Sequence, residues 1–481
     1  MALEAARKQR LTLLNWIMAL PAAALLVLVF LVDLPISSST IVTTLPGYTG
    51  DLPFTLETGY VGVGENEEAQ LFYYFVESQR SPKKDPLMLW ITGGPGCSSL
   101  IGFMFENGPL SFTYEDYSGG LPTLHVNPYA WTQGLNILYL DAPVGTGFSY
   151  SVTSQGYHVD DRTFVAHAYE FLQKWMMNHT EYLENQLYIG GDSYSGIPIP
   201  MLVQDILDGV GSGPLFNLKG YVLGNPVTDS FIDDNSRIPF AHRLTLIPDD
   251  LYKEAEKSCH GDFVNVDPNN KQCAVDILAI DELVRQINEE QVLEPACSNS
   301  APQPDDAILS RRFLKQNSKH LFRSLPTAPS HWCRSYNMAL CTIWANNAAV
   351  QEALNVRNGS KSEWEVCISI DNYTEDVSST LDYHRNLSKA NLQALIYSGD
   401  HDMSIPHIGT QEWISSLNLT LNDVWRAWFV DGQVAGYTKK YKNNDYSLTF
   451  ATVKGAGHFA AMYKIEECSA MVDRWLAHFP L

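Results

Sequence analysis

The sequence predicts an α/β fold in which helices wrap a mostly parallel central sheet. Three observations favour it. Continuous apolar runs of strand length recur along the chain, which is typical of strands buried on both faces of a sheet. Glycine-rich loops follow several of these runs, and segments of helical periodicity lie between them. The chain of 481 residues could hold two or three domains, but α/β enzymes often form one long core with an insertion, and we expect that organisation.

The strands and helices are expected in the following order. Residues 57–63 and 70–77 flank the turn residues Gly64-Glu65-Asn66, which predicts an opening β-hairpin. Buried strands are expected at residues 86–92, 134–141, 218–222, 392–398 and 448–453, with one more at the start of residues 187–196. Helices are expected at residues 163–177, 197–207 and 466–479.

Residues 187–196 carry a short apolar strand, a turn of small residues and the start of a helix, with Ser193 at the apex of the turn. In this context Gly-x-Ser-x-small is a nucleophile elbow, in which backbone strain holds the serine oxygen clear of the sheet. Ser195 replaces the glycine of the strict pattern, and Gly196 keeps the volume small. We predict Ser193 as the nucleophile; taken alone, the motif also fits a surface serine in a glycine-rich loop.

The glycines at 93, 94 and 96 directly follow the apolar run 86–92. Glycines at the carboxyl end of a buried strand let a backbone N–H approach a ligand closely, which is how an oxyanion hole is built in this architecture. The alternative interpretation is a plain turn. Residues 142–150 form a second glycine-rich loop that we expect at the same edge of the sheet.

Asp402 and His458 follow the last two apolar runs, so Ser193, Asp402 and His458 occur in the chain order of the α/β-hydrolase fold. A serine hydroxyl needs an imidazole to take its proton, and the imidazole needs a carboxylate to fix its tautomer. Asp400 competes for the acid role; we favour Asp402 because a Gly-x-x-Asp turn returns a carboxylate toward the sheet edge. We interpret the neighbouring histidines, His401 and His407, as loop residues.

The strand pattern is lost between residues 231 and 360, where helical pieces mix with cysteines. We interpret this region as a disulfide-stapled lid inserted into the sheet. The predicted organisation is therefore a first part of the core at 37–230, the insertion at 231–360 and a second part of the core at 361–481. Residues 291–325, with Arg311-Arg312, are the expected site of proteolytic nicking.

The amino terminus has basic residues before an apolar run over residues 11–32, so we interpret residues 1–36 as a signal peptide or, if uncleaved, a membrane anchor. Eight cysteines and five Asn-x-Ser/Thr sequons also indicate the secretory pathway, with a vacuolar or extracellular destination. The sequon asparagines are Asn178, Asn358, Asn372, Asn386 and Asn418. The formal net charge of -22 argues against nucleic-acid and anionic-membrane partners. We expect no cofactor and no metal ion.

Four stretches of this sequence resemble the serine carboxypeptidase-like family. They are Trp-Ile-Thr-Gly-Gly-Pro-Gly-Cys-Ser-Ser, Gly-Asp-Ser-Tyr-Ser-Gly, Ser-Gly-Asp-His-Asp and Gly-Ala-Gly-His. The resemblance implies an α/β-hydrolase fold and an oxyanion hole made by the backbone N–H groups of Gly94 and Tyr194. It also implies disulfides Cys97–Cys367, Cys259–Cys273 and Cys297–Cys333, with Cys341 and Cys468 free.

The departures from the family pattern bear on function. The resemblance places Thr92, Gly93, Glu106 and Asp192 at the substrate, where carboxypeptidases of the family have Asn for Thr92 and Glu for Asp192 to hold a peptide's terminal carboxylate. Thr92 with Asp192 is similar to the plant acyltransferase branch, which moves an acyl group from a 1-O-β-glucose ester to an alcohol. Phe459-Ala460-Ala461-Met462 departs from that branch as well.

The sequence therefore predicts a serine-dependent acyltransferase that takes an acyl-glucose donor and an alcohol acceptor. The first alternative is a serine-type carboxypeptidase, which would use the same acyl-enzyme but admit a different substrate. A binding protein that kept the fold without turnover is a third hypothesis, and the complete set of Ser193, Asp402 and His458 speaks against it.

Overall fold

The computed structural model describes residues 39–112, 117, 119–209, 213–296, 334–368 and 373–481. The predicted signal segment, the expected nicking site at Arg311-Arg312, the Cys297–Cys333 pair and the sequon at Asn372 lie outside these residues. Within them, no helix combines the length and the apolar character needed to cross a membrane.

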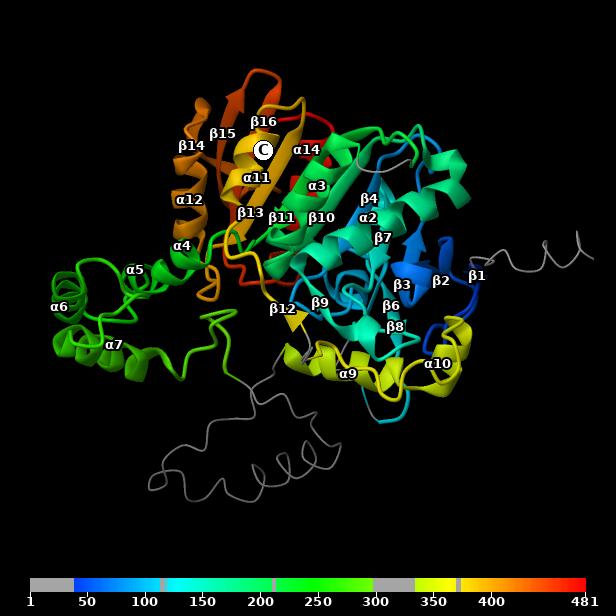
Figure 1. The fold of residues 1–481 in the computed structure, drawn as a ribbon, viewed down its shortest axis with the longest axis horizontal. Coiled ribbons are helices and arrows are strands. Elements are labelled where there is room, and N and C mark those ends of the chain that lie inside the picture. Colours follow the sequence, from blue (N-terminus) through cyan, green and yellow to red (C-terminus); the bar gives the residue numbers. More distant parts are fainter. Residues whose placement is uncertain (1–38, 113–116, 118, 210–212, 297–333, 369–372) are drawn as a thin grey trace, which may run out of the picture. The chain divides into compact units, whose positions relative to one another are not determined.

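A sheet of 12 strands organises the chain, in the order β1-β2-β3-β7-β4-β10-β11-β13-β16-β15-β14, with β8 paired to β3 (Figure 1). Its centre, from β7 to β16, is parallel, whereas β1 to β3 and β14 to β15 are antiparallel. The parallel strands are β7 (Asn136–Leu140), β4 (Leu87–Ile91), β10 (Leu187–Asp192), β11 (Leu218–Gly224), β13 (Gln393–Gly399) and β16 (Tyr446–Val453). The opening strands are β1 (Thr40–Val42), β2 (Leu56–Val63) and β3 (Ala69–Val76), and β8 is Tyr150–Ser151. The last two strands of the order are β15 (Gln433–Asn443) and β14 (Thr420–Val430). The mostly parallel sheet and the opening hairpin agree with the sequence prediction.

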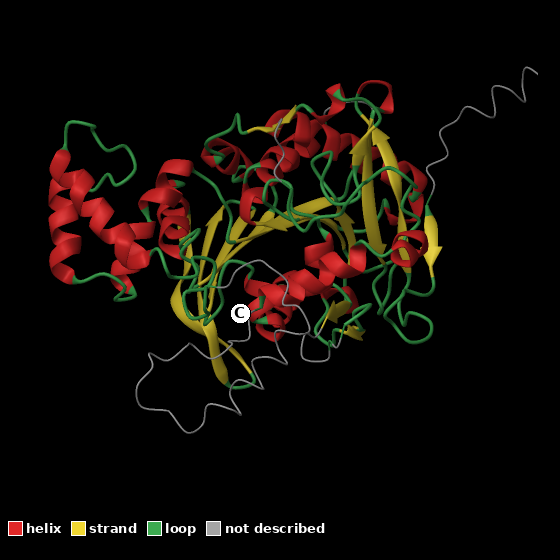
Figure 2. Cartoon of the chain, turned by 90° about the horizontal axis from the view of Figure 1, so that it is seen from below, coloured by secondary structure: helices red, strands yellow, loops and turns green. Residues whose placement is uncertain are grey.

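Helices cover both faces of the sheet (Figure 2). On one face α2 (Asp161–Asn178), α3 (Pro198–Asp208), α11 (Leu381–Leu387) and α12 (His407–Ser416) share a buried cluster with alternate strand residues such as Leu89 and Ile189. On the other face η2 (Gly102–Glu106) and α14 (Ile465–Leu476) pack with Trp90 and Tyr188. Successive side chains of a strand point to opposite faces, which is why β4 and the first half of β10, Leu187–Ile189, are apolar on both faces.

The region predicted as one insertion, 231–360, consists of two parts that pack differently. The helices α4 (Ser230–Asn235), α5 (Arg237–Arg243), α6 (Asp249–Cys259) and α7 (Lys271–Val284) bury their apolar residues mainly in two small clusters of their own. In contrast, α9 (Ser335–Ala345) and α10 (Ala348–Ala353) contribute Trp344 and Val350 to the main core. The later part of the region thus supports the sheet, because its apolar side chains find partners there.

The sequence analysis missed the longest hairpin of the sheet, formed by β14 (Thr420–Val430) and β15 (Gln433–Asn443). β14 is an edge strand, and most of its residues are exposed or half-buried, so the hairpin lacks the continuous apolar run used to find buried strands. Asp431 and Gly432 make its turn with φ of 47° and 75°, the conformation that a two-residue hairpin loop requires. The closing helix is α14, preceded by the short α13 (Ala460–Tyr463).

Candidate active site

Ser193 lies in a sharp turn between β10 and α3. Its φ is 57°, a left-handed conformation that costs a non-glycine residue free energy and is typical of functional turns. A Cβ on Gly191 would lie 2.2 Å from the carbonyl oxygen of Ile91, and one on Gly196 would lie 2.1 Å from that of Val227. The elbow therefore needs minimal volume on both sides of the serine, as the sequence pattern indicated.

The structure brings Ser193, His458 and Asp402 together in one hydrogen-bonded chain. The Nε2 of His458 lies 2.8 Å from the Oγ of Ser193, and its Nδ1 lies 2.8 Å from Oδ2 of Asp402. With Asp402 ionised, Nδ1–H donates to the carboxylate and Nε2 is free to accept the serine proton. Asp402 is fully buried and His458 is 7% exposed.

Asp402 is itself held by three donors. The amide of Asn225 donates to Oδ2 at 2.7 Å, and the backbone N–H groups of Ser404 and Ile405 donate to Oδ1 at 2.8 and 3.2 Å. Asp400 faces elsewhere: its Oδ1 accepts from the N–H of Gly455 at 2.6 Å and lies 2.5 Å from Nδ1 of His401. Of the two acids considered from the sequence, Asp402 is the one in contact with the imidazole.

Burial opposes the charged form of the His458 imidazole, but the charge of Asp402 and its hydrogen bond outweigh burial and raise the pKa of His458 above its ordinary value. The carboxylate therefore makes the imidazole a stronger base. His407, which the sequence analysis interpreted as a loop residue, is half-buried, and this desolvation lowers its pKa to about 4. It stays neutral and lies on α12, outside the chain of hydrogen bonds at Ser193.

The glycines after β4 lie against the elbow. A Cβ on Gly93 would be 2.6 Å from the backbone nitrogen of Tyr194, so only glycine lets this loop approach the N–H that follows the nucleophile. Gly94 has a φ of 118°, which again favours glycine. The backbone groups of Gly94 and Tyr194, expected as oxyanion donors from the resemblance, belong to these two adjoining segments.

A buried carboxylate that the sequence analysis did not single out anchors the glycine loop. Asp141 accepts from the Oγ of Ser98 at 2.6 Å, from the N–H of Ser99 at 2.9 Å and from the N–H of Phe148 at 3.0 Å. Burial raises its pKa to about 6, although these donors favour the charged form. Asp141 thus ties the 93–99 loop to the 142–150 loop.

Asp161, at the start of α2, anchors the elbow through Tyr194, the residue after the nucleophile. Its carboxylate accepts from the hydroxyls of Tyr194 at 2.6 Å and Tyr373 at 2.7 Å, and from the N–H groups of Asp376 and Val377 at 2.8 and 2.9 Å. Neither Asp161 nor Asn225 was identified from the sequence. Asn225 directly follows β11, so the rule that parallel strands gather their carboxyl ends at one edge could have found it.

Thr92, Glu106 and Asp192 form a buried polar group beside the elbow. The pairing of Ile91 with Gly191 places Thr92 and Asp192 as neighbours just beyond the paired residues of β4 and β10. Among the described residues, the Oγ1 of Thr92, the Oε1 of Glu106 and both carboxylate oxygens of Asp192 are buried without a hydrogen-bond partner. Such groups are rare in folded proteins and call for a ligand or ordered water.

Burial raises the pKa of Asp192 to about 7, although the His458 charge and the nearby Gly93 N–H favour the ionised form. Burial also raises the pKa of Glu106 well above its ordinary value, and repulsion from Asp192 adds to this effect. Burial and mutual repulsion favour a proton on this pair of acids, so the group can donate as well as accept hydrogen bonds.

The described cysteines and sequons can also be placed. Disulfides join Cys97 to Cys367 and Cys259 to Cys273, while Cys341 and Cys468 are free and buried, as the resemblance implied. The first disulfide ties the glycine loop of the site to residues before β12 (Tyr373–Thr374). The asparagines of the four described sequons are exposed, namely Asn178, Asn358, Asn386 and Asn418.

The chain is similar to known proteins over nearly its whole length. The family model for serine carboxypeptidase matches residues 46–478. Serine carboxypeptidase-like 2 of Arabidopsis thaliana is 46% identical over 459 residues, which cover 95% of this chain and 97% of that protein. Serine carboxypeptidase-like 1 of the same plant is 45% identical over the same shares.

Among solved structures, the prohormone-processing carboxypeptidase Kex1(delta)p of Saccharomyces cerevisiae aligns with a TM-score of 0.69 at 19% identity, covering 88% of this chain and 92% of that one. This likeness shows the α/β-hydrolase fold. With the family model and the plant relatives, it leads to one conclusion: the chain belongs to the serine carboxypeptidase family.

Proposed function

We propose that this protein is an acyltransferase, which moves an acyl group from a 1-O-β-glucose ester to the hydroxyl of an acceptor through an acyl-enzyme on Ser193. The observation that carries this proposal is the pair Thr92 and Asp192, buried beside the elbow. The alternative is a serine-type carboxypeptidase, and the retained acid Glu106 is the feature that favours it.

In the first half of the reaction, the Oγ of Ser193 attacks the ester carbonyl while Nε2 of His458 takes the serine proton. The backbone N–H groups of Gly94 and Tyr194 stabilise the oxyanion. The tetrahedral intermediate then expels glucose, whose leaving oxygen receives the proton from His458, and the acyl group remains on Ser193. Asp402 keeps Nδ1 protonated and stabilises the imidazolium throughout.

In the second half, His458 removes the proton of the acceptor hydroxyl, and the acceptor oxygen attacks the acyl-enzyme. Ser193 leaves and recovers its proton from His458, and the new ester is released. Water would give hydrolysis by the same steps, so transfer requires that the acceptor is bound and water is excluded. The N–H of His458 donates to the carbonyl of Glu290, which lies after α7, so this end of the insertion borders the site and is our candidate for the element that excludes water.

The substitutions at 92 and 192 bear on which substrates are admitted. A peptidase that releases terminal residues must hold a free carboxylate, and the resemblance assigns this task to an amide and longer acids. Thr92 and Asp192 have shorter side chains, and each charge-assisted hydrogen bond that no longer reaches costs about 1.5–3 kcal/mol. Two lost contacts give discrimination against peptides on the order of a hundredfold to ten-thousandfold.

The test compares kcat/KM for a 1-O-acyl-glucose with an alcohol acceptor and for blocked dipeptides, in the wild type and in the variant Thr92→Asn/Asp192→Glu. We expect transfer to dominate in the wild type and peptide cleavage to rise in the double variant, with Ser193→Ala inactive toward both substrates. A wild-type peptidase efficiency that equals or exceeds the transfer efficiency refutes the acyltransferase and supports the carboxypeptidase.

We also infer that the protein passes through the secretory pathway to the vacuole or the extracellular space. Two disulfides and four exposed sequon asparagines support this inference. Removal of N-linked glycans with an endoglycosidase, followed by gel electrophoresis of protein from plant cells, tests it; an unchanged mobility contradicts it.

A further inference from the structure

Residues 288–292, which we call the return segment, lead from α7 back to the site. The backbone carbonyl of Glu289 accepts from the N–H groups of Met403 at 2.8 Å and Ser404 at 3.1 Å. Both donors belong to the turn that carries Asp402. The N–H of Val292 donates to the carbonyl of His401 at 3.1 Å. The return segment therefore holds the Asp402 turn from both ends.

The return segment also holds the turn that carries His458. The N–H of His458 itself donates to the carbonyl of Glu290 at 2.7 Å. The side-chain amide of Gln291 donates to the carbonyl of Gly455 at 3.1 Å, and Gln291 is only 2% exposed. One short segment of the insertion thus bonds to the backbones of both turns that the imidazole and its carboxylate depend on.

Gly457 shows how tight this contact is. A Cβ at Gly457 would lie 2.1 Å from the carbonyl oxygen of Glu290 and 2.8 Å from the Cβ of Gln291. No side chain fits there unless the return segment or the His458 turn moves. The glycine before the imidazole is therefore needed for the approach of the insertion.

The side chain of Glu290 acts on the imidazole as well. Glu290 is exposed, yet its negative charge adds to that of Asp402 and Asp192 in raising the pKa of His458. Two further ionisable groups lie in this region. The charge of Glu290 also acts on Tyr463 of α13, and Arg334 lies over the Tyr463 ring and pairs with Glu294. The Asp400–His401 pair lies in the Asp402 turn.

We propose that the return segment fixes the distance between Asp402 and His458, and that Glu290 is a positioning residue for His458 through its carbonyl group and its charge. The insertion then has a role beyond covering the substrate, because it completes the scaffold of the proposed triad. This inference rests on the proposed serine chemistry, but it holds for any acyl donor and for either hydrolysis or transfer.

The first test alters the backbone contact and measures the second-order rate of labelling of the full-length protein by a fluorophosphonate. Gly457→Ala displaces Glu290 from His458, and a displacement near 1 Å costs on the order of a hundredfold in rate. Gln291→Met removes the donor to Gly455 at similar volume, and we expect a smaller loss of about threefold to tenfold. Thermal unfolding of each variant shows whether the fold is retained.

The second test uses Glu290→Gln, a surface substitution with little effect on folding. Labelling requires a neutral imidazole. Loss of the Glu290 charge lowers the pKa of His458, so the midpoint of the pH–rate profile moves to lower pH by a few tenths of a unit at low salt. Glu282→Gln is the matched control, since Glu282 lies on α7 and pairs with Arg285. Its midpoint stays at the wild-type value.

The outcomes separate this inference from the proposed function. Labelling of the wild type that persists in Ser193→Ala refutes the nucleophile and with it the proposed function. The role of the return segment is overturned if labelling depends on Ser193 but the other variants behave like the wild type. That result would be unchanged rates in folded Gly457→Ala and Gln291→Met and an unchanged midpoint in Glu290→Gln. If Gly457→Ala does not fold, Glu290→Gln and Gln291→Met decide the matter.

Discussion

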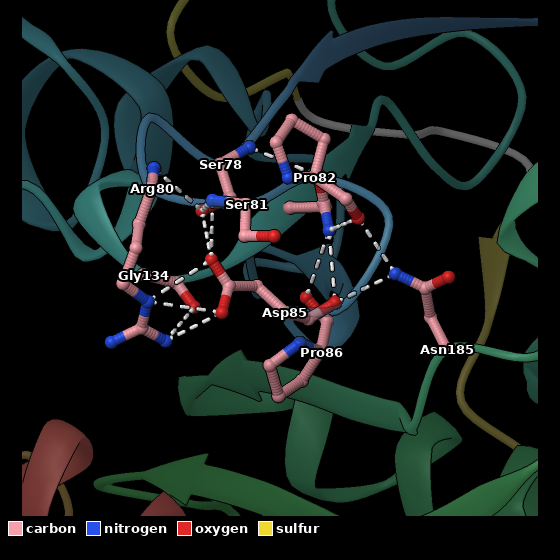
Figure 3. Close-up of polar contacts among 9 residues, drawn as sticks. Ser78, Arg80, Ser81, Pro82, Asp85, Pro86, Gly134 and Asn185 are labelled. Carbon is pink, nitrogen blue, oxygen red and sulfur yellow. Dashed lines mark hydrogen bonds and ion pairs between the residues drawn. The ribbon is translucent and has the colours of Figure 1, made fainter.

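Buried polar groups have hydrogen-bond partners at the amino end of strand β4 and lack them at its carboxyl end. At its amino end, Asp85 accepts from the Oγ of Ser78 at 2.6 Å, from the N–H of Ser81 at 2.9 Å and from the guanidinium of Arg80 at 2.6 Å (Figure 3). Asn136 and Asn185 each donate to the carbonyl groups of Pro82 and Asp85. At its carboxyl end, Thr92 and its neighbours Glu106 and Asp192 have buried oxygens without partners among the described residues.

This difference separates stability from function along a single strand. The network at the amino end closes the 78–86 loop and leaves Asp85 fully engaged, so it contributes to folding. The polar oxygens at the carboxyl end lower stability as they stand, because burial without a hydrogen bond costs free energy. Groups kept in that condition beside a strained serine are available to a substrate.

The largest expected effect is at the edge of the sheet where the carboxyl ends of the parallel strands lie, at Asp402 after β13. Asp402→Asn should lower the transfer rate about ten-thousandfold, because the imidazole loses the carboxylate that fixes its tautomer, as in the comparable serine protease template. Asp400→Asn should lower it far less, because Asp400 contacts Gly455 and His401 instead. Single-turnover rates of both variants measure this, and the reverse ranking would assign the acid role to Asp400.

A substitution at the amino end of β4 should lower stability and leave catalysis unchanged. Asp85→Ala leaves the Ser78, Ser81 and Arg80 donors without their acceptor and should cost about 2–4 kcal/mol of unfolding free energy with kcat unchanged. Arg80→Ala is the control; its side chain is 61% exposed, so we expect a loss below about 1 kcal/mol. Urea unfolding and steady-state kinetics measure the two effects. A drop in kcat without a loss of stability would contradict the separation.

The smallest expected effect concerns the pH dependence of stability. The folded-state pKa values of Glu106 and Asp192 are raised, so the folded protein retains protons that the unfolded chain releases above about pH 4. Their contribution to stability is present at low pH and is lost as pH rises toward 7. Glu106→Gln keeps one of the two positions neutral.

Between pH 5 and pH 7 the Tm of the wild type should therefore fall by about 2–5 °C more than the Tm of Glu106→Gln. Differential scanning calorimetry at several pH values measures the slopes. Glu282→Gln serves as the control, since Glu282 is exposed. Parallel curves for Glu106→Gln and the wild type would show that the pair titrates normally.

Much of the fold could be predicted because its signals are local. The apolar runs at β4, β7, β10, β13 and β16 have the length and composition of buried strands, and each lies where the sequence placed it. The β14–β15 hairpin was missed because an edge strand with exposed side chains carries no such run. The sequence analysis did not predict that α9 packs against the main core, because a core helix and a lid helix have the same hydrophobic periodicity. Only the packing partners of Trp344 distinguish the two.

The same distinction applies to the candidate site. By itself, the sequence determined the elbow at Ser193, the glycine loop after β4 and the order of Ser193, Asp402 and His458, because a strand followed by a special turn is a local pattern. Only the tertiary structure decided that Asp402 rather than Asp400 contacts His458. Asp141, Asp161 and residues 288–292 likewise hold these turns from a distance in the chain. Those contacts join segments up to 216 residues apart, and no short-range pattern encodes a hydrogen bond that forms only when the sheet has assembled.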